Sequence, residues 1–304
     1  MGAFNSSSQG GWYRRLTVSG IMKQCNAFGA NITSLSRMIA DISEKELLET
    51  LTNTDADGIV WLLPEPQHWK IIEDLVKSKV NLVLVRNSHG NDGFASVEVD
   101  YERVGFEAGR FLIDKGCEGV LLFTRLKADL TSEIALKHGF WPSNISFGFH
   151  KSFHCFDGNT SHESVIELPL GGSYSKALRK FSQALQNYSS DYGLFFIDPM
   201  YLAHFLVHTG NEGVKAIKDR KIVMINNWDN YSIFSPYADS LDIYSFMDQP
   251  EEVGVLAVQK LSSLVDGHLA NTVTSLQLSL KKYSTKNSIQ KLVEEIDVRE
   301  IEDF

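Results

Sequence analysis

Polar residues follow three apolar runs in the first third of the chain, and their side chains suit hydroxyl-rich ligands. The apolar run 59–63 is followed by Pro64-Glu65, the run 80–85 by Arg86-Asn87-Ser88, and the run 96–99 by Asp100-Tyr101. Carboxylates and amides accept paired hydrogen bonds from ligand hydroxyl groups. Ligands of open parallel sheets bind beyond the carboxyl ends of the strands. These endings therefore predict a binding surface.

No motif of the sequence indicates an enzyme. Gly-x-Ser-x-Gly, Gly-x-Gly-x-x-Gly, a phosphate loop and His-Glu-x-x-His are all absent. His204 and His208 share one face of a predicted helix, but without a third ligand nearby we interpret them as a solvated pair. The cysteines, Cys25, Cys117 and Cys155, lack Cys-x-x-Cys spacing. We expect no catalytic residue, cofactor or metal, and keep an enzyme on the same fold as an alternative.

Strands and helices that would position these residues alternate along the chain. Apolar runs without polar alternation are typical of strands covered on both faces, and residues 69–79 between two such runs have helical spacing. Ser43 and Glu46 form a capping box that opens another helix. Further strands are predicted at 3–5, 30–35, 120–123, 192–197, 222–225, 243–246 and 273–280, and further helices at 12–28, 101–115, 132–138, 173–188, 200–209 and 250–265. Residues 140–156 have a loop-like composition, and irregular structure is expected over 141–170.

Length and composition indicate a globular α/β chain with more than one lobe. The 304 residues are 43% hydrophobic and 22% charged, with 7 prolines, which suits two lobes of about 130 to 150 residues each. The formal charge of −9 excludes wrapping nucleic acid unaided, because phosphate binding needs clustered Lys and Arg. No apolar run approaches the roughly 20 residues of a membrane helix. Unpaired cysteines favour the reducing cytoplasm.

Several segments together resemble the effector-binding core of lactose-repressor and galactose-repressor type (LacI/GalR) transcription regulators, which is similar to the periplasmic sugar-binding proteins. Order and spacing carry the likeness over roughly residues 2 to 285. The segments are Asp57-Gly58-Ile59-Val60; 96–100 followed by Gly105, Ala108 and Gly109; 195–198 with Ala203; Trp228-Asp229-Asn230; 250–254 with Ala257; and the closing segment 280–285.

The resemblance implies the type I periplasmic-binding-protein-like fold, with two doubly wound parallel-sheet lobes joined by three hinge crossovers. The N-terminal lobe would hold residues 1–122 and 248–277, and the C-terminal lobe residues 124–245 and 280–304. The crossovers would lie near Phe123, Phe246 and Ser279. A DNA-binding helix-turn-helix domain would precede residue 1 in the parent protein and is absent from this chain.

The family's ligand contacts, transferred by position, fall mainly on polar and aromatic residues at strand ends. They are Ser6, Trp12, Tyr13, Arg86, Asp100, Arg125, Asp198, Trp228, Asp229 and Asp248. Other readings stay open for most of them. The aspartates can instead cap the helices that follow them, the aromatic residues near position 12 can belong to the core, and Asn87 can replace its neighbour Arg86.

One departure from the family pattern concerns an arginine. The family commonly has Arg-x-x-Gly-aromatic, where the guanidinium grips ligand oxygens with a bidentate fork. Here Leu136 stands before Gly139-Phe140. Arg125 in the preceding loop is a candidate substitute. The change puts ordinary sugar recognition in doubt.

The expected function is therefore ligand sensing in a cytoplasmic LacI-family transcription regulator, such as a repressor. The partners would be a small-molecule effector, a sugar or related polyol or nucleoside, and a second copy of the chain in a homodimer. DNA would be bound only through the absent helix-turn-helix domain, and no membrane is expected. The alternative is a periplasmic solute-binding protein of a sugar ABC transporter.

Overall fold

The computed structural model describes residues 8–34, 43–64, 68–86, 93–124, 141–154, 165–169, 174–226, 233–268 and 272–283. These residues form two compact units. Along the described ranges the chain passes between the units three times, at Asp100/Tyr101, Asp248/Gln249 and Gln277/Leu278. The predicted α/β class with two parallel-sheet lobes is confirmed.

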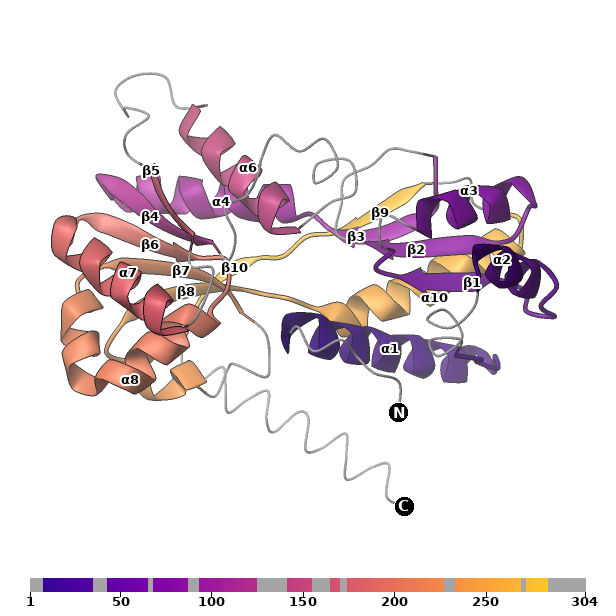
Figure 1. The fold of residues 1–304 in the computed structure, drawn as a ribbon, viewed down its shortest axis with the longest axis horizontal. Coiled ribbons are helices and arrows are strands. Elements are labelled where there is room, and N and C mark those ends of the chain that lie inside the picture. The colour runs from indigo at the N-terminus through magenta and orange to yellow at the C-terminus, as the bar shows by residue number, and fades with distance from the viewer. Residues whose placement is uncertain are drawn as a thin grey trace, which may run out of the picture. The chain divides into compact units, whose positions relative to one another are not determined.

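The first unit is a four-stranded parallel sheet with helices on both faces. Its elements are α1 (Ser8–Phe28), α2 (Glu44–Thr52), β1 (Ile59–Leu62), α3 (Trp69–Lys77), β2 (Leu82–Arg86), β3 (Ser96–Val99), α10 (Pro250–Val265) and β9 (Val273–Leu276). The strand order is β1-β2-β3-β9, and every pair is parallel. Helices α1 and α10 cover one face, and α2 and α3 cover the other (Figure 1).

Local chemistry explains where two helices of this unit begin. The Ser43 hydroxyl accepts from the Glu46 amide, and the Glu46 carboxylate accepts from the Ser43 amide, so the predicted capping box is confirmed. Pro250 stands in the first turn of α10, followed by Glu251 and Glu252, which complement the positive end of the helix dipole.

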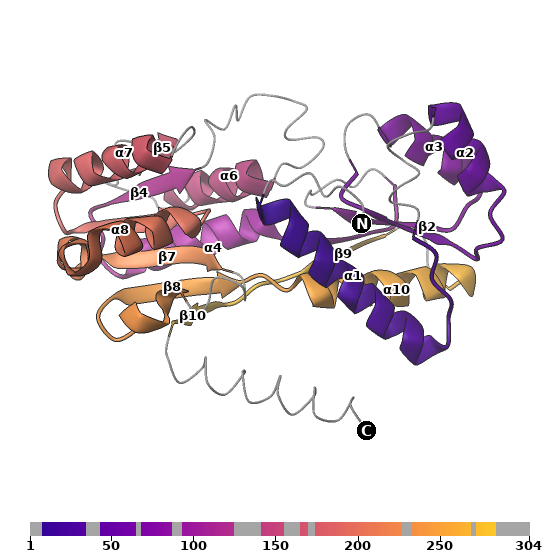
Figure 2. The ribbon, with the colours of Figure 1, turned by 60° about the horizontal axis from the view of Figure 1, so that its bottom comes forward.

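The second unit is a six-stranded sheet with one antiparallel edge. Its elements are α4 (Tyr101–Asp114), β4 (Gly119–Thr124), α6 (Trp141–His154), β5 (Val165–Pro169), α7 (Tyr174–Asn187), β6 (Tyr192–Phe196), α8 (Met200–Ile217), β7 (Lys221–Asn226), the 3₁₀ helix η3 (Ser235–Tyr237), β8 (Asp242–Met247) and β10 (Leu280–Lys282). The order is β10-β8-β7-β6-β4-β5, and only β10 runs antiparallel to its neighbour. Helices α4 and α6 cover one face, and α7 and α8 the other (Figures 1 and 2).

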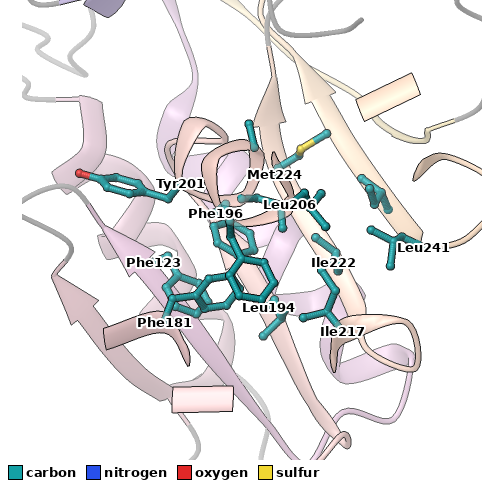
Figure 3. Packing of buried hydrophobic residues seen from close by; sticks show 14 of the residues in the cluster. Phe123, Phe181, Leu194, Phe196, Tyr201, Leu206, Ile217, Ile222, Met224 and Leu241 are labelled. Carbon is teal, nitrogen blue, oxygen red and sulfur yellow. The ribbon is translucent and has the colours of Figure 1, made fainter. Parts of the chain in front are cut away.

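Aromatic side chains fill the core between this sheet and the helices α7 and α8. Phe123 stacks on Phe196 of the neighbouring strand, with ring centroids 4.5 Å apart. Phe181 of α7 meets both rings edge-on, at 4.8 Å and 5.4 Å (Figure 3). Edge-to-face and offset arrangements suit the ring quadrupoles. This core holds β4 and β6 firmly, and with them the residues at their carboxyl ends.

The structure corrects several predicted elements. Residues 30–34 form no strand. Helix α1 begins at Ser8 and not at residue 12, and α8 continues beyond residue 209 to Ile217 across a kink at Gly210, whose φ is 56°. The stretch expected to be irregular contains α6 and β5. The strand at 3–5 and the helix at 132–138 lie outside the described residues.

The lobe boundary near residue 122 is also corrected. Strand β4 pairs with β5 and β6 in the second sheet, and α4 packs on α6. Both elements therefore belong to the second unit, and the first passage lies at Asp100/Tyr101 and not near Phe123. The other two passages lie within two residues of the expected positions, Phe246 and Ser279.

Candidate ligand-binding site

The carboxyl edge of the second sheet gathers polar residues from neighbouring strands. Thr124 ends β4, Asp198 follows β6, Asn226 ends β7 and Asp248 follows β8. Because β8, β7, β6 and β4 are consecutive in the sheet, the four residues line one edge. Thr124 is 1% exposed, and Asp198 and Asp248 are each 6% exposed. This edge is the best-described part of the candidate site.

Asp248 is held by a tyrosine that the sequence analysis assigned no role. The Tyr101 hydroxyl donates to Oδ2 of Asp248 over 2.9 Å, and Tyr101 is 3% exposed. Hydrogen bonds to an ionised acceptor in a water-poor setting are among the stronger ones in proteins. Tyr101 therefore fixes the orientation of a predicted ligand contact. Its position directly after Asp100, at the start of a helix, is the only sequence signal.

Asp198 caps the helix that follows β6. Its Oδ1 accepts from the Met200 amide over 3.0 Å at the start of α8. The alternative reading as a cap is thus confirmed, and a ligand contact by the same carboxylate stays a prediction. Tyr201 stands one residue further on, 8% exposed, with its hydroxyl pointing away from the apolar cluster (Figure 3). A carboxylate and an aromatic ring accordingly stand close together in sequence at this edge.

The first unit has its own carboxyl edge. Arg86 is the last residue of β2 and Asp100 directly follows β3, so the two predicted contacts end neighbouring strands. The Asp100 amide donates to the carbonyl of Leu276 at the end of β9, over 3.0 Å. Tyr13 lies inside α1 and is only 7% exposed, as the core interpretation requires. Trp12 lies on the same helix.

Four predicted contacts lie outside the described residues, namely Ser6, Arg125, Trp228 and Asp229. For these four the ligand role stays a prediction, and Leu136, which stands in the family's arginine position, also lies outside the described residues.

Helix α6 contains a second stretch with the family's spacing, which the sequence analysis missed. Gly148-Phe149 stands three residues after Ile145, in the arrangement x-x-x-Gly-aromatic. Gly148 packs directly against the Glu102 carbonyl of α4, where a Cβ atom would overlap it, and Ile145 is fully buried. In both stretches, an apolar residue, Leu136 or Ile145, stands three positions before the Gly-aromatic pair.

Metal and membrane signals are absent from the described part of the chain. No group of three or more His, Cys, Asp or Glu side chains there could hold a metal ion. Likewise, none of the helices within the described ranges is long and apolar enough to cross a membrane.

The sequence was compared with protein families and with curated proteins. No protein-family model matches the sequence. Catabolite control protein A of Staphylococcus epidermidis is 24% identical over 204 residues, covering 65% of this chain and 56% of that protein. The chain thus spans a little over half of the curated relative it matches.

Solved structures match over most of the chain. A LacI transcriptional regulator from Lactobacillus brevis has a TM-score of 0.64 at 14% identity, covering 89% of this chain and 95% of that one. GanP, a glucose-galactose binding protein from Geobacillus stearothermophilus, scores 0.62 at 17% identity over 89% and 92%. A LacI family regulator from Enterococcus faecium with bound ribose scores 0.60 at 17% identity over 89% and 92%. The resemblance seen in the sequence is confirmed, and the chain has the fold of the effector-binding core of LacI-type transcription regulators.

Proposed function

We propose that this chain is the ligand-sensing domain of a cytoplasmic LacI-type transcription regulator. It binds a small polar molecule, a sugar or a related polyol or nucleoside, in the cleft that this family has between its lobes, and it does so without converting it. The observation that carries the proposal is the row of buried polar residues at the carboxyl edge of the second sheet, Thr124, Asp198 and Asp248. Ribose bound to a relative of the same fold supports this ligand class.

The chemistry of this edge favours a neutral or cationic ligand over an anion. Buried carboxylates accept hydrogen bonds from hydroxyl or amino groups and repel carboxylates and phosphates. Asp198 and Asp248 supply such acceptors, whereas the motif that gives other members an arginine has Leu136 or Ile145. A polyhydroxylated ligand without a phosphate group fits these residues best.

Control of DNA binding follows from unequal affinity for two conformations. Ligand shifts a conformational equilibrium only by as much as it prefers one state. The formal charge of this chain is −9, so a separate, positively charged domain has to bind the DNA phosphates. In this proposal a helix-turn-helix domain fused before residue 1 is that domain. The conformation that the ligand favours then sets the distance between the two helix-turn-helix domains of a dimer.

The proposed dimer partner is a second copy of the chain, meeting it along α1. This helix exposes Val18, Met22 and Phe28, with exposed fractions of 39%, 52% and 52%. Val18 and Met22 are four residues apart and share one face of the helix, whereas Phe28 lies at its C-terminal end. Exposed apolar side chains grouped on one helix are typical of association surfaces.

A second candidate is a periplasmic solute-binding protein, favoured by the likeness to GanP. That glucose-galactose binding protein has nearly the same TM-score as the regulator from Lactobacillus brevis. The codons before residue 1 in the gene discriminate the two: a basic helix-turn-helix of about 60 residues supports the regulator, and a signal peptide overturns it.

A thermal-shift screen with Asp198→Asn tests the ligand site. Ribose, glucose, cellobiose, nucleosides and amino acids serve as probes, since a ligand of the native state raises the melting temperature. An asparagine oxygen still accepts from the Met200 amide and preserves the cap, while the negative charge is lost. We expect the shift to vanish with an unchanged unliganded melting temperature. Asp239→Asn, at an exposed position, is the matched control.

The same screen can contradict the proposal. A shift that survives Asp198→Asn removes this carboxylate from the site. If chromatography detects a product formed from a bound probe, the chain is an enzyme on this fold and the proposal is wrong.

A further inference from the structure

Lysine and aromatic side chains form a strip on the second unit, where α4 meets β8. Phe111 of α4 contacts Tyr244 of β8, with ring centroids 4.3 Å apart. The Lys115 ammonium lies 5.4 Å from the centre of the Phe111 ring, and that of Lys282 lies 5.8 Å from the centre of the Tyr244 ring. Both rings are half-buried and both lysines are exposed. The strip thus carries an exposed ammonium group over a half-buried ring at each end.

The Asp242 carboxylate beside the strip is shared between two lysines. Asp242 lies 2.6 Å from Nζ of Lys221 and 3.1 Å from Nζ of Lys282. Burial alone would raise the pKa of Asp242, but the hydrogen bonds from the two lysines outweigh it and lower the pKa. Lys115 brings a third ammonium group to this surface, over the Phe111 ring. The strip itself, Phe111, Lys115, Tyr244 and Lys282, contributes two lysines on a chain whose formal charge is −9.

Tyr283, the last residue that the structure describes, lies beside this strip. Strand β10 is antiparallel to β8, and Lys282 pairs with Tyr244. The Tyr283 amide then donates to the carbonyl of Ile243 over 2.9 Å, and its 3% exposed ring fixes the chain at this point. Asp242 and Lys221 are the first residues of β8 and β7. The backbone of Tyr283 therefore pairs with Ile243, the residue next to the shared carboxylate of Asp242.

The residues that follow have the complementary chemistry. In the range 292–304 only Arg299 is basic. The acidic residues of this range are Glu294, Glu295, Asp297, Glu300, Glu302 and Asp303, and the apolar ones are Leu292, Val293, Ile296, Val298, Ile301 and Phe304. This mixture of acids and apolar residues matches a surface of lysines and rings.

We propose that residues 292–304 dock on the strip of Phe111, Lys115, Tyr244 and Lys282 in the same molecule. The acids pair with the ammonium groups, and apolar side chains cover the faces of the two rings. Exposed ion pairs contribute little alone, so covering the rings is required for stable docking. The strip would then couple the C-terminal segment to the edge of the second sheet, independently of any ligand.

The tether makes this contact feasible. From Tyr283 to residue 292 an extended chain spans up to roughly 30 Å, several times the spacing of about 5 Å between neighbouring strands. A short tether also gives an effective concentration of about millimolar, so a weak contact in solution becomes a populated one within the molecule.

Proteolysis of the full chain by a glutamate-specific protease tests the docking. We expect cleavage after Glu294, Glu295 and Glu300 to be several-fold slower than in a synthetic peptide of residues 288–304. The double variant Lys115→Glu with Lys282→Glu, and high salt, should restore the rate of the free peptide. Lys176→Glu with Lys218→Glu is the matched control, since both lysines are exposed and lie on α7 or after α8.

A truncated chain ending at Asn287 gives a second, independent readout. We expect it to bind the fluorescein-labelled 288–304 peptide at low salt and to lose the binding in the charge-reversed double variant. No detectable binding, or cleavage of the intact chain at the rate of the free peptide, overturns the proposal. A cleavage rate that falls with rising protein concentration overturns docking in the same molecule, because it indicates exchange between copies.

Discussion

The hydroxyl of Tyr101 donates to Oδ2 of Asp248, and both side chains are almost inaccessible. A hydrogen bond to a buried charged group contributes about 1.5–3 kcal/mol to stability, because its loss leaves the carboxylate poorly solvated. We expect Tyr101→Phe to lower the free energy of unfolding by this amount, as measured by urea denaturation. Tyr237→Phe, at a half-buried tyrosine, should change it by less than about 0.5 kcal/mol. If both variants lost the same free energy of unfolding, the hydrogen bond between Tyr101 and Asp248 would not contribute to stability.

The buried ammonium group of Lys260 should make the stability of the protein depend on pH, and one substitution can isolate this effect. Its ammonium donates to the hydroxyls of Thr272 and Thr274 over 3.0 Å and 2.9 Å, at 5% exposure, and burial lowers its pKa. The protonated amine therefore costs stability below the folded pKa. That cost disappears as the pH rises from the folded pKa towards the usual value for lysine.

The matched comparison is between the wild type and Lys260→Met, because all other titrating groups are shared. We expect the wild type to gain stability relative to the variant as the pH rises from neutral towards 10, in melts at several pH values. A constant difference between the two proteins would show that Lys260 titrates normally.

At the scale of elements, close approach of α4 and α6 depends on glycines. A Cβ atom at Gly148 would overlap the carbonyl of Glu102 on the neighbouring helix. Separating packed helices costs about 1–3 kcal/mol. We expect Gly148→Ala to destabilise by at least this much in chemical denaturation, although alanine favours helix by about 1 kcal/mol. Phe147→Ala, at a 47% exposed neighbour, should cost less.

Helix α6 also shows why some elements could not be predicted. Its sequence holds glycine, serine and several aromatic residues without a clear helical period, and such a composition predicts a loop. The helix forms because Gly148 and its neighbours fit against α4, which is a tertiary effect. The capping box of Ser43 and Glu46 was predictable, since the signal and the structure lie within four residues of each other.

The order of strands in a sheet is likewise a property of the folded chain. Alternation of strand and helix predicted the α/β class, but no local pattern says which sheet a strand joins. The family resemblance implies a first lobe that runs to residue 122 and so includes most of β4, yet β4 pairs with β5 and β6. The site shows the same limit: the carboxyl edges were predictable from polar strand endings, whereas the bond between Tyr101 and Asp248 joins residues far apart in sequence.

The proposed dimer gives a prediction for the whole molecule. Met22 on α1 is 52% exposed, with Val18 and Phe28 exposed on the same helix. A glutamate at this position would place a charge in an apolar interface, where an unpaired buried charge is very unfavourable. We expect Met22→Glu to convert a dimer into a monomer in light-scattering chromatography without lowering the melting temperature of the monomer. Val207→Glu, on the 71% exposed Val207 of α8, should leave the dimer intact. A wild type that is monomeric at micromolar concentration, or a Met22→Glu variant that stays dimeric, would place the association surface elsewhere.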